Sequence, residues 1–552
     1  MVELGGNKGL FGSLLLLFAT VAAYTDYDRN ANMYDTYSGA VYEHIPIKPP
    51  RVQNISRYEA LRVIRQNLEI YANMVREAER SRADVIVFPE YGLFGVFAFG
   101  TMKSHDSIHP FLETIPEVEH AKWNPCEERD LDEEDYIIQK KLSCLARDNR
   151  MHIVASLGEK ARCNRRSNHK CPSHSYYHYS STVVFSDKGN LVAKYRRMAL
   201  LNEPYFDSPD EFSIAVFETI QNKFAVVSSY DTMLKEPITE LLNKRKVKNI
   251  IIPNVWRSSS PLLSSVQWHS SWAIGNEVNV LAATIHDTNI GSYGSGIYFP
   301  YSESSYYNKP DSTRGHLLID HVKMNRYSRQ KKPVIPHLSV SFGKFSYHSV
   351  KILGEEIRFK FIDLPKYTDN VSICSGSFCC KVDYSGESLE SEKYSLGIYK
   401  GFINALDRRM SFEICTVMNC NRVCGKDIFS ADTYFSRFGL SGYNFTADHI
   451  YPQMVFMNKG DQILDDVWQY EHGKINSKRM FNNPLHSATM IGRIYNEDKS
   501  LPTFGTSGFP VNEDRRYSGR TRYDRKNGAV SRFTLTVFVV VMGTILSVLS
   551  FS

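Results

Sequence analysis

The distribution of the cysteines most constrains how this chain of 552 residues can fold. Its ten cysteines form two even sets, and none lies between Cys171 and Cys374. The sets are Cys126, Cys144, Cys163 and Cys171, then Cys374, Cys379, Cys380, Cys415, Cys420 and Cys424. Even sets predict disulfides within each half in an oxidising compartment, although spacing does not define the pairing. We therefore expect two globular domains, which this length and a hydrophobic content of 42% support.

A zinc site is an alternative use of two of these cysteines. Cys163 and Cys171 precede His174 and His178, and thiolates with imidazoles at short spacing can complete a tetrahedral zinc ion. The interval between the two cysteines is loose for a zinc site, and secretion favours a disulfide. We accordingly predict no metal and no cofactor.

The N-terminus has the layout of a cleaved signal peptide. Residues 10–21 are apolar, a lysine precedes them, and the small pair Ala22 and Ala23 follows. The chain is therefore expected to enter the secretory pathway. Three sequons are candidate glycosylation sites in that compartment, at Asn54, Asn370 and Asn444.

The C-terminal region has the pattern of a lipid-anchor signal. Residues 533–552 carry no charge, and the stretch before them is strongly polar. A spanning helix over the same residues is the alternative, but it has no basic cytoplasmic flank. The pattern favours replacement of the tail by a glycosylphosphatidylinositol (GPI) anchor at Ser518 or Asn527. We expect the protein at the extracellular face of the cell membrane, with simple secretion as the alternative.

The charge balance excludes one class of partner. A net charge of +6 is spread over 66 basic and 60 acidic residues, so the chain has no dense basic footprint for nucleic acid.

The first half predicts alternating helices and strands. Ser56 and Glu59 form a capping box, and apolar residues then recur at helical spacing from Leu61 to Met74. Short β-branched runs typical of buried strands follow at 83–89, 152–156, 182–185, 224–227, 249–253 and 278–284. Beyond about Ser339, alternating aromatic and β-branched residues with clustered cysteines predict a smaller β-rich domain.

Three segments of the first half resemble the motifs of nitrilase-type amidases. They are Val85-Ile-Val-Phe-Pro-Glu90-Tyr-Gly, Leu191-Val-Ala-Lys-Tyr-Arg-Arg197 with Glu203-Pro-Tyr-Phe206, and Phe224-Ala-Val-Val-Ser-Ser229-Tyr-Asp231. The finer resemblance is to the vanin and biotinidase branch of the carbon-nitrogen hydrolases. It rests on Val41-Tyr-Glu-His44, Asn124-Pro-Cys126, Leu142-Ser-Cys144, Trp268-His-Ser-Ser-Trp-Ala273, Gly294-Ser-Gly-Ile-Tyr298 and Cys379-Cys380, which together cover nearly all of the mature chain.

The resemblance implies a fold and a domain order. The fold is a four-layer α-β-β-α sandwich followed by a smaller β-rich domain. The expected parts are a signal peptide at 1–23, a nitrilase-like domain at 24–335, a β-rich domain at 336–510, a polar spacer at 511–532 and an anchor signal at 533–552.

The resemblance also implies a reaction. In this family a cysteine thiolate attacks a linear amide such as a pantetheine or biotin amide, a carbon-nitrogen bond other than a peptide bond. A glutamate is the general base, and a lysine stabilises the oxyanion. The three positions fall on Glu90, Arg197 and Ser229, so only the glutamate is retained. Lys194 cannot replace the lysine, because a shift of three residues on a strand turns a side chain to the opposite face.

These losses predict an impaired catalyst. An alcohol is far less acidic than a thiol, and an arginine is permanently charged and cannot move a proton. We expect a pseudoenzyme that binds a small-molecule amide, with a weak amidase acting through Ser229 as the alternative. Glu203, His269 and Trp272 are expected to line the pocket, with packing in the core as the alternative for His269 and Trp272. The protein is expected to be a monomer or dimer.

Overall fold

The computed structural model describes residues 36–500, apart from 52–53, 96–104, 119–122, 132–133, 202, 221, 324–343, 367–368, 388–391, 421–423 and 425–430. The predicted signal peptide, spacer and anchor signal lie outside the described residues, as do Ser518 and Asn527. The predicted boundary between the two domains, at 335/336, also lies outside them. Asn54, Asn370 and Asn444 are described, and all three are exposed.

Helix α2 (Arg57–Arg80) begins where the sequence predicts. The Ser56 hydroxyl accepts a hydrogen bond from the Glu59 amide at 3.3 Å, and the Glu59 carboxylate accepts one from the Ser56 amide at 2.9 Å. This capping box satisfies amide groups that have no partner within the first helical turn. The apolar side of the helix is buried, so the amphipathic spacing faces a core.

The first sheet of the N-terminal domain mixes parallel and antiparallel pairs. Strand β1 pairs parallel with β2 and antiparallel with β12, and β2 pairs parallel with β3. In sheet order the strands are β12 (His316–Lys323), β1 (Thr36–Glu43), β2 (Val85–Val87), β3 (His152–Arg162), β4 (Tyr176–Phe185) and β5 (Leu191–Arg196).

The second sheet packs against the first through a shared apolar core, and it also contains both parallel and antiparallel pairs. Its parallel core consists of β7, β8 and β9, whose side chains are almost wholly buried. In sheet order the strands are β11 (Ser305–Tyr307), β10 (Ser295–Tyr298), β9 (Asn279–Thr284), β8 (Asn249–Asn254), β7 (Lys223–Val226) and β6 (Ala215–Glu218). All the strands predicted from β-branched runs lie in these two sheets.

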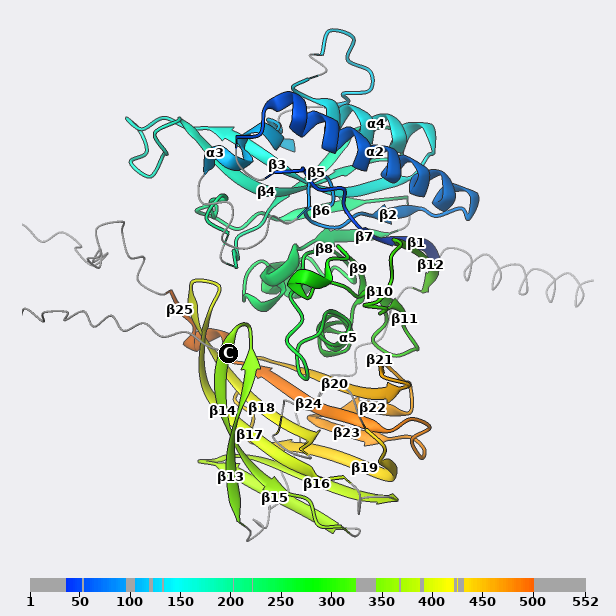
Figure 1. Cartoon of the computed structure of the whole chain (residues 1–552), viewed down its shortest axis with the longest axis vertical. Helices are drawn as coiled ribbons and strands as arrows, with labels where there is room; N and C mark the ends of the chain where they lie inside the picture. Colours follow the sequence, from blue (N-terminus) through cyan, green and yellow to red (C-terminus); the bar gives the residue numbers. More distant parts are fainter. Residues whose placement is uncertain are drawn as a thin grey trace, which may run out of the picture. The chain divides into compact units, whose positions relative to one another are not determined.

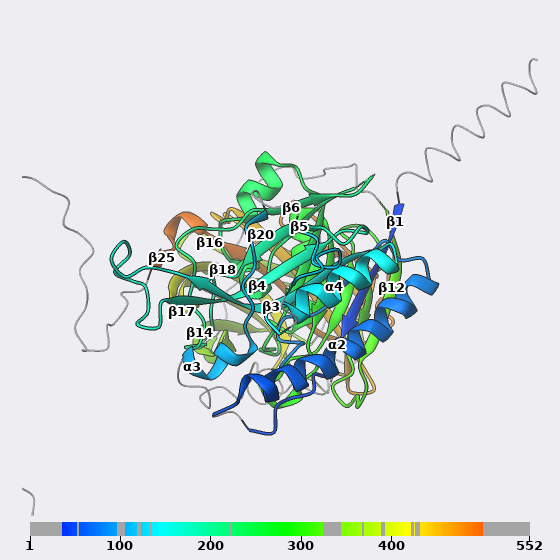
Figure 2. The ribbon, with the colours of Figure 1, turned by 90° about the horizontal axis from the view of Figure 1, so that it is seen from above.

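Helices cover the outer faces of the two sheets. Helix α2 and helix α4 (Ile137–Asp148) pack on the first sheet, as the view from above shows (Figure 2). Helix α5 (Ser265–Asn276) packs on the second sheet (Figure 1). Apolar residues from both sheets, such as Val41, Val154 and Ile251, form a core between them. The predicted α-β-β-α order is therefore confirmed.

Shorter helical segments connect these layers. They are α3 (His105–Ile108), 3₁₀ helices at His109–Phe111, Ser229–Met233, Thr288–Ile290 and Tyr495–Glu497, and a π-helical turn at Glu240–Lys244. Within the described ranges, no helix is both long and apolar enough to cross a membrane.

The C-terminal part is β-rich, as predicted, and consists of antiparallel pairs in two sheets. The first contains β13 (Phe345–Ile352), β14 (Glu355–Asp363), β17 (Tyr394–Ala405), β18 (Arg408–Asn419), β24 (Leu485–Arg493), β20 (His449–Asn458) and β21 (Asp461–Ile463), with β25 (Lys499–Ser500) beside β18. The second contains β15 (Asp369–Ser375), β16 (Phe378–Glu387), β19 (Tyr434–Tyr443), β23 (Lys474–Ser477) and β22 (Trp468–Glu471). A third core lies between these sheets.

The disulfides stay within each half, as the even cysteine sets predict. All ten cysteines are described, and the bonds are Cys126–Cys144, Cys163–Cys171, Cys374–Cys379, Cys380–Cys415 and Cys420–Cys424. The alternative zinc site with two cysteine ligands is therefore wrong, because Cys163 and Cys171 are bonded to each other and offer no thiolates.

Helix α5 joins the two halves through an unusually close approach to β20. A Cβ atom added to Gly275 would lie 2.5 Å from the Ile450 carbonyl oxygen and 2.8 Å from the Tyr451 ring. The Gln453 amide of the same strand donates to the Leu262 carbonyl at 2.6 Å. Only a residue without a side chain lets the helix approach the strand this closely.

We predict that Gly275→Ala lowers the free energy of unfolding by about 1–3 kcal/mol, because the carbonyl at this contact is backbone and cannot rotate away. Chemical denaturation of the purified protein measures the change. Gly439→Ala is the matched control, since a Cβ atom there meets Asn476 at an ordinary 3.4 Å. Equal stability of the two variants would show that the α5 contact is not tight.

Candidate active site

The residues singled out by the amidase-like motifs follow three different strands. Glu90 follows β2, Arg197 directly follows β5, and Ser229 follows β7 of the other sheet. The exposed fractions of Glu90, Arg197 and Ser229 are 1%, 0% and 0%. The fold thus buries two charged residues and a hydroxyl just beyond the ends of three strands.

Arg197 lies between two glutamates. Its Nε lies 2.9 Å from Glu90 Oε1, at an angle that makes this an ion pair without a hydrogen bond, and its Nη2 donates to Glu203. Its Nη2 also lies 3.5 Å from the Tyr91 hydroxyl. Two buried carboxylates therefore share one guanidinium, and the paired charges offset part of the cost of burial.

Glu90 also accepts a hydrogen bond from the Ser180 hydroxyl of β4. Its second oxygen has no hydrogen-bond partner among the described residues, and neither does Nη1 of Arg197. Burial raises the pKa of the Glu90 carboxyl to about 7, with the attraction of Arg197 opposing the rise and the charge of Glu203 adding to it. Burial acts to lower the pKa of Arg197, but the charges of Glu203 and Glu90 hold this pKa well above its ordinary value.

Ser229 begins the 3₁₀ helix that follows β7 and lies in a strained elbow. Its φ angle is +46°, in the left-handed region that serine rarely adopts. Its hydroxyl donates to the Val255 carbonyl at 3.2 Å. A strand-to-helix elbow of this kind is the backbone shape that presents a nucleophile in hydrolases.

Asp231 ties this elbow to the segment that carries Arg197. Its carboxylate accepts hydrogen bonds from the Met198 amide at 2.8 Å, the Ala199 amide at 2.6 Å and the Tyr195 hydroxyl at 2.6 Å. Burial raises the pKa of Asp231 as well. Asp231 thus ties the elbow at Ser229 to the backbone that directly follows Arg197.

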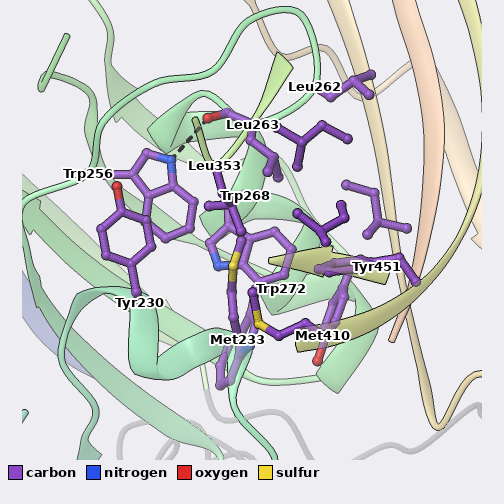
Figure 3. Packing of buried hydrophobic residues seen from close by; sticks show 14 of the residues in the cluster. Tyr230, Met233, Trp256, Leu262, Leu263, Trp268, Trp272, Leu353, Met410 and Tyr451 are labelled. Carbon is purple, nitrogen blue, oxygen red and sulfur yellow. Dashed lines mark hydrogen bonds between the residues drawn. The ribbon is translucent and has the colours of Figure 1, made fainter. Parts of the chain in front are cut away.

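An aromatic cluster supports the elbow from α5 (Figure 3). Trp268 and Trp272 donate their indole N–H groups to the Thr232 hydroxyl at 2.9 Å and the Thr232 carbonyl at 3.0 Å. From the C-terminal part, Arg493 donates to the Met233 carbonyl at 3.2 Å. Both halves of the protein therefore hold the backbone around Ser229.

A cavity of about 430 Å³ reaches the residues beside the site. It is lined by Leu201, four residues after Arg197, and by Tyr230, the neighbour of Ser229. Residues of the C-terminal part, including Lys351 and Asp461, line its other side. This volume suits a small ligand rather than a polymer.

Comparison with known proteins shows the family of this chain. The family model described as carbon-nitrogen hydrolase matches residues 61–258, and the vanin C-terminal domain matches residues 353–498. Bovine (Bos taurus) pantetheinase is 32% identical over 488 residues, which cover 86% of this chain and 92% of the relative. The chain belongs to the vanin branch of the carbon-nitrogen hydrolases. Human (Homo sapiens) pantetheinase is 31% identical, with 87% and 93% covered, and mouse (Mus musculus) biotinidase is 31% identical, with 83% and 93% covered.

Lys194, which lies three residues before Arg197, forms ion pairs with a different pair of glutamates. Its Nζ lies 2.8 Å from Glu117 and 3.2 Å from Glu159, on the face of β5 that also carries Arg196. The alternation of the strand therefore separates it from Arg197, as predicted.

Two residues expected at the pocket lie in the aromatic cluster instead of against the buried charges. His269 bonds through Nδ1 to the Ser265 carbonyl at 2.8 Å, and its ring lies 5.3 Å from that of Trp256. Trp272 is fully buried in the same cluster. Of the three predicted pocket residues, Glu203 alone contacts Arg197.

Sequence reasoning did not identify Ser180 or Asp231 as parts of the site. Asp231 stands inside the quoted nucleophile motif, so its position two residues after Ser229 is a usable signal. Ser180 has no such signal, because its contact with Glu90 depends on the pairing of β4 with β3.

We predict that Glu90→Gln becomes more stable relative to the native protein as pH rises. The raised pKa means that folded Glu90 retains a proton between about pH 4.5 and pH 7, while the unfolded chain has released it. Native stability therefore falls across this window, by about 3 kcal/mol from this group. Glutamine cannot ionise and escapes this loss, which urea unfolding at a series of pH values measures.

Glu59→Gln is the control of opposite sign. Hydrogen bonds from Ser56 and Arg51 lower the pKa of Glu59 to about 2, so its contribution is present at neutral pH and is lost as pH falls through that value. A Glu90→Gln profile parallel to the native one would contradict the raised pKa.

Proposed function

We propose that this protein is a vanin-branch ectodomain that binds a small amide but hydrolyses it poorly or not at all. The observation that carries the proposal is the state of the three catalytic positions. Every cysteine forms a disulfide, and Arg197 is held between Glu90 and Glu203. Neither a thiolate nor a mobile ammonium group is present for the family reaction.

The buried ion pairs argue against a new catalytic role for Arg197. A guanidinium stays charged at every physiological pH and cannot move a proton to a leaving group. Its charge also lowers the pKa of Glu90 from the value that burial alone would give, which reduces the basicity of that carboxylate. Ser229 would need a base to activate its alcohol, and its hydroxyl is directed to the Val255 carbonyl.

A weak amidase acting through Ser229 is the second candidate function. Two observations favour it: the elbow at Ser229 and the raised pKa of Glu90, which matches a general base working near neutral pH. The substrate class would be the one named by the relatives, pantetheine or biotin amides.

One assay separates the two functions. The purified protein is incubated with a panel of pantetheine and biotin amides, beside Glu90→Gln. Binding without turnover supports the impaired ectodomain. Turnover that disappears in Glu90→Gln supports the amidase and overturns the proposal.

We predict that Ser229→Cys combined with Arg197→Lys gains amidase activity. The double variant supplies a thiolate at the elbow and a compact ammonium beside Glu90 and Glu203. Each single variant should gain far less, because nucleophile and charge act as one unit. The new thiol has no free cysteine to pair with.

Covalent labelling tests this prediction without relying on turnover. A thiol-directed amide analogue should label the double variant, and mass spectrometry should place the adduct at position 229. Ser228→Cys with Arg197→Lys is the matched control, since it adds a thiol one residue away from the elbow position. A folded double variant with neither adduct nor turnover would show that the pocket has diverged.

For the location of the protein, we propose GPI anchoring at the cell surface, as a monomer or dimer. The uncharged segment 533–552 supports the anchor. We predict that phosphatidylinositol-specific phospholipase releases the protein from intact cells, and that truncation before Ser518 gives a freely secreted protein. Retention on cells after a digestion that releases a known anchored protein would favour a spanning helix.

A further inference from the structure

A cluster of histidines lies beside the candidate active site. His105 of α3, His174 before β4 and His178 within β4 each offer a ring nitrogen, and these atoms lie within 4.8 Å of one another. His105 Nδ1 is 3.2 Å from His174 Nε2. The rings of His174 and His178 are stacked with centroids 4.9 Å apart.

Neighbouring groups hold this cluster in place. The Cys163–Cys171 disulfide closes the connection between β3 and β4 just before His174. Asp207 accepts a hydrogen bond from the His178 amide at 2.8 Å, and its other oxygen lies 3.5 Å from His105 Nε2. The three imidazoles are therefore positioned by β4, by a disulfide and by a carboxylate.

Hydrogen bonding between histidines explains only part of the arrangement. Two pairs are within hydrogen-bond distance, His105 with His174 and His109 with His178, the latter at 3.1 Å. These pairs leave Nδ1 of both His174 and His178 without a hydrogen-bond partner among the described residues, although both atoms are buried. His178 itself is 0% exposed. An unpartnered buried nitrogen is costly, and an ion is one of the groups that can satisfy it.

We infer that His105, His174 and His178 form a binding site for a divalent transition-metal ion of the zinc type. Neutral imidazoles are preferred ligands of zinc, whose bonds of about 2.0–2.1 Å place tetrahedral ligands about 3.3 Å apart. The separation of 3.2 Å between His105 and His174 matches that spacing. The partial exposure of His174 lets its ring move toward the ion.

Asp207 and His109 complete the environment of the site. A carboxylate facing the far nitrogen of a ligating histidine fixes its tautomer and strengthens it as a ligand, which is the position of Asp207 behind His105. His109 is placed to orient the ring of His178. Lys160 and Arg57 are nearby cations, and Asp106 is a nearby acid that offsets them.

The metal site would be coupled to the candidate active site through two segments. His178 and Ser180 lie two residues apart on β4 and so share a face, about 7 Å apart, and Ser180 donates to Glu90. Asp207 follows Glu203 by four residues in the segment that contacts Arg197. This inference does not depend on the proposed function.

The test uses the full-length protein, stripped with a chelator and titrated with Zn²⁺ in a calorimeter. We expect one zinc ion per chain and a rise in the unfolding temperature on binding. Substitution by Co²⁺ should give the visible absorption of a tetrahedral site. His174→Gln, on a partly exposed loop that tolerates the change, should weaken zinc binding by more than about 100-fold, and Asp207→Asn by about 10–100-fold.

His321→Gln is the matched control, because it removes an exposed imidazole far from the cluster in sequence and should leave binding unchanged. Circular dichroism confirms that each variant is folded. A native protein that binds no stoichiometric zinc would overturn the inference. So would native affinity in both His174→Gln and His178→Gln, which would place binding at other histidines of the chain.

Discussion

The packing of helix α5 is the constraint on which the rest of the structure depends. Apart from Ser270 and Ile274, its residues are buried, because the second sheet covers one side and β20 covers the other. The indoles of Trp268 and Trp272 fill this layer and also hold the backbone of the Ser229 elbow. Since one cluster of side chains serves both halves, the β-rich part is a structural component of the candidate active site.

The buried charges set the chemistry that this scaffold can perform. Glu90, Glu203 and Asp231 are three buried carboxylates, and Arg197 is the cation that faces two of them. In such a dry environment removal of the cation leaves uncompensated charge, so the constellation is tightly constrained. Arg197 is thus part of what keeps the interior stable, and a lysine replacing it must still satisfy both glutamates.

Sequence motifs located the ends of the strands that carry the site, because an amidase-like motif specifies residue types at the ends of short buried strands. They did not locate the partners that the charged groups would find. Asp231 and Ser180 act through contacts across strands and loops, and such contacts depend on sheet pairing. The discarded zinc alternative shows the same limit. Its two histidines are in a cluster, but its cysteines are bonded to each other and the third imidazole, His105, lies about seventy residues earlier.

The sequence by itself determined the layered α/β domain, the β-rich second part, the disulfides within each half and the presence of Arg197 and Ser229 in the amidase-like motifs. These follow from local periodicity, cysteine count and motif residues, which the chain order contains directly. Only the tertiary structure decided that Arg197 is locked between two glutamates, that Trp272 and His269 pack in an aromatic cluster, and that three histidines converge beside β4. These depend on which distant segments come into contact, and the packing of two sheets and a shared helix determines that.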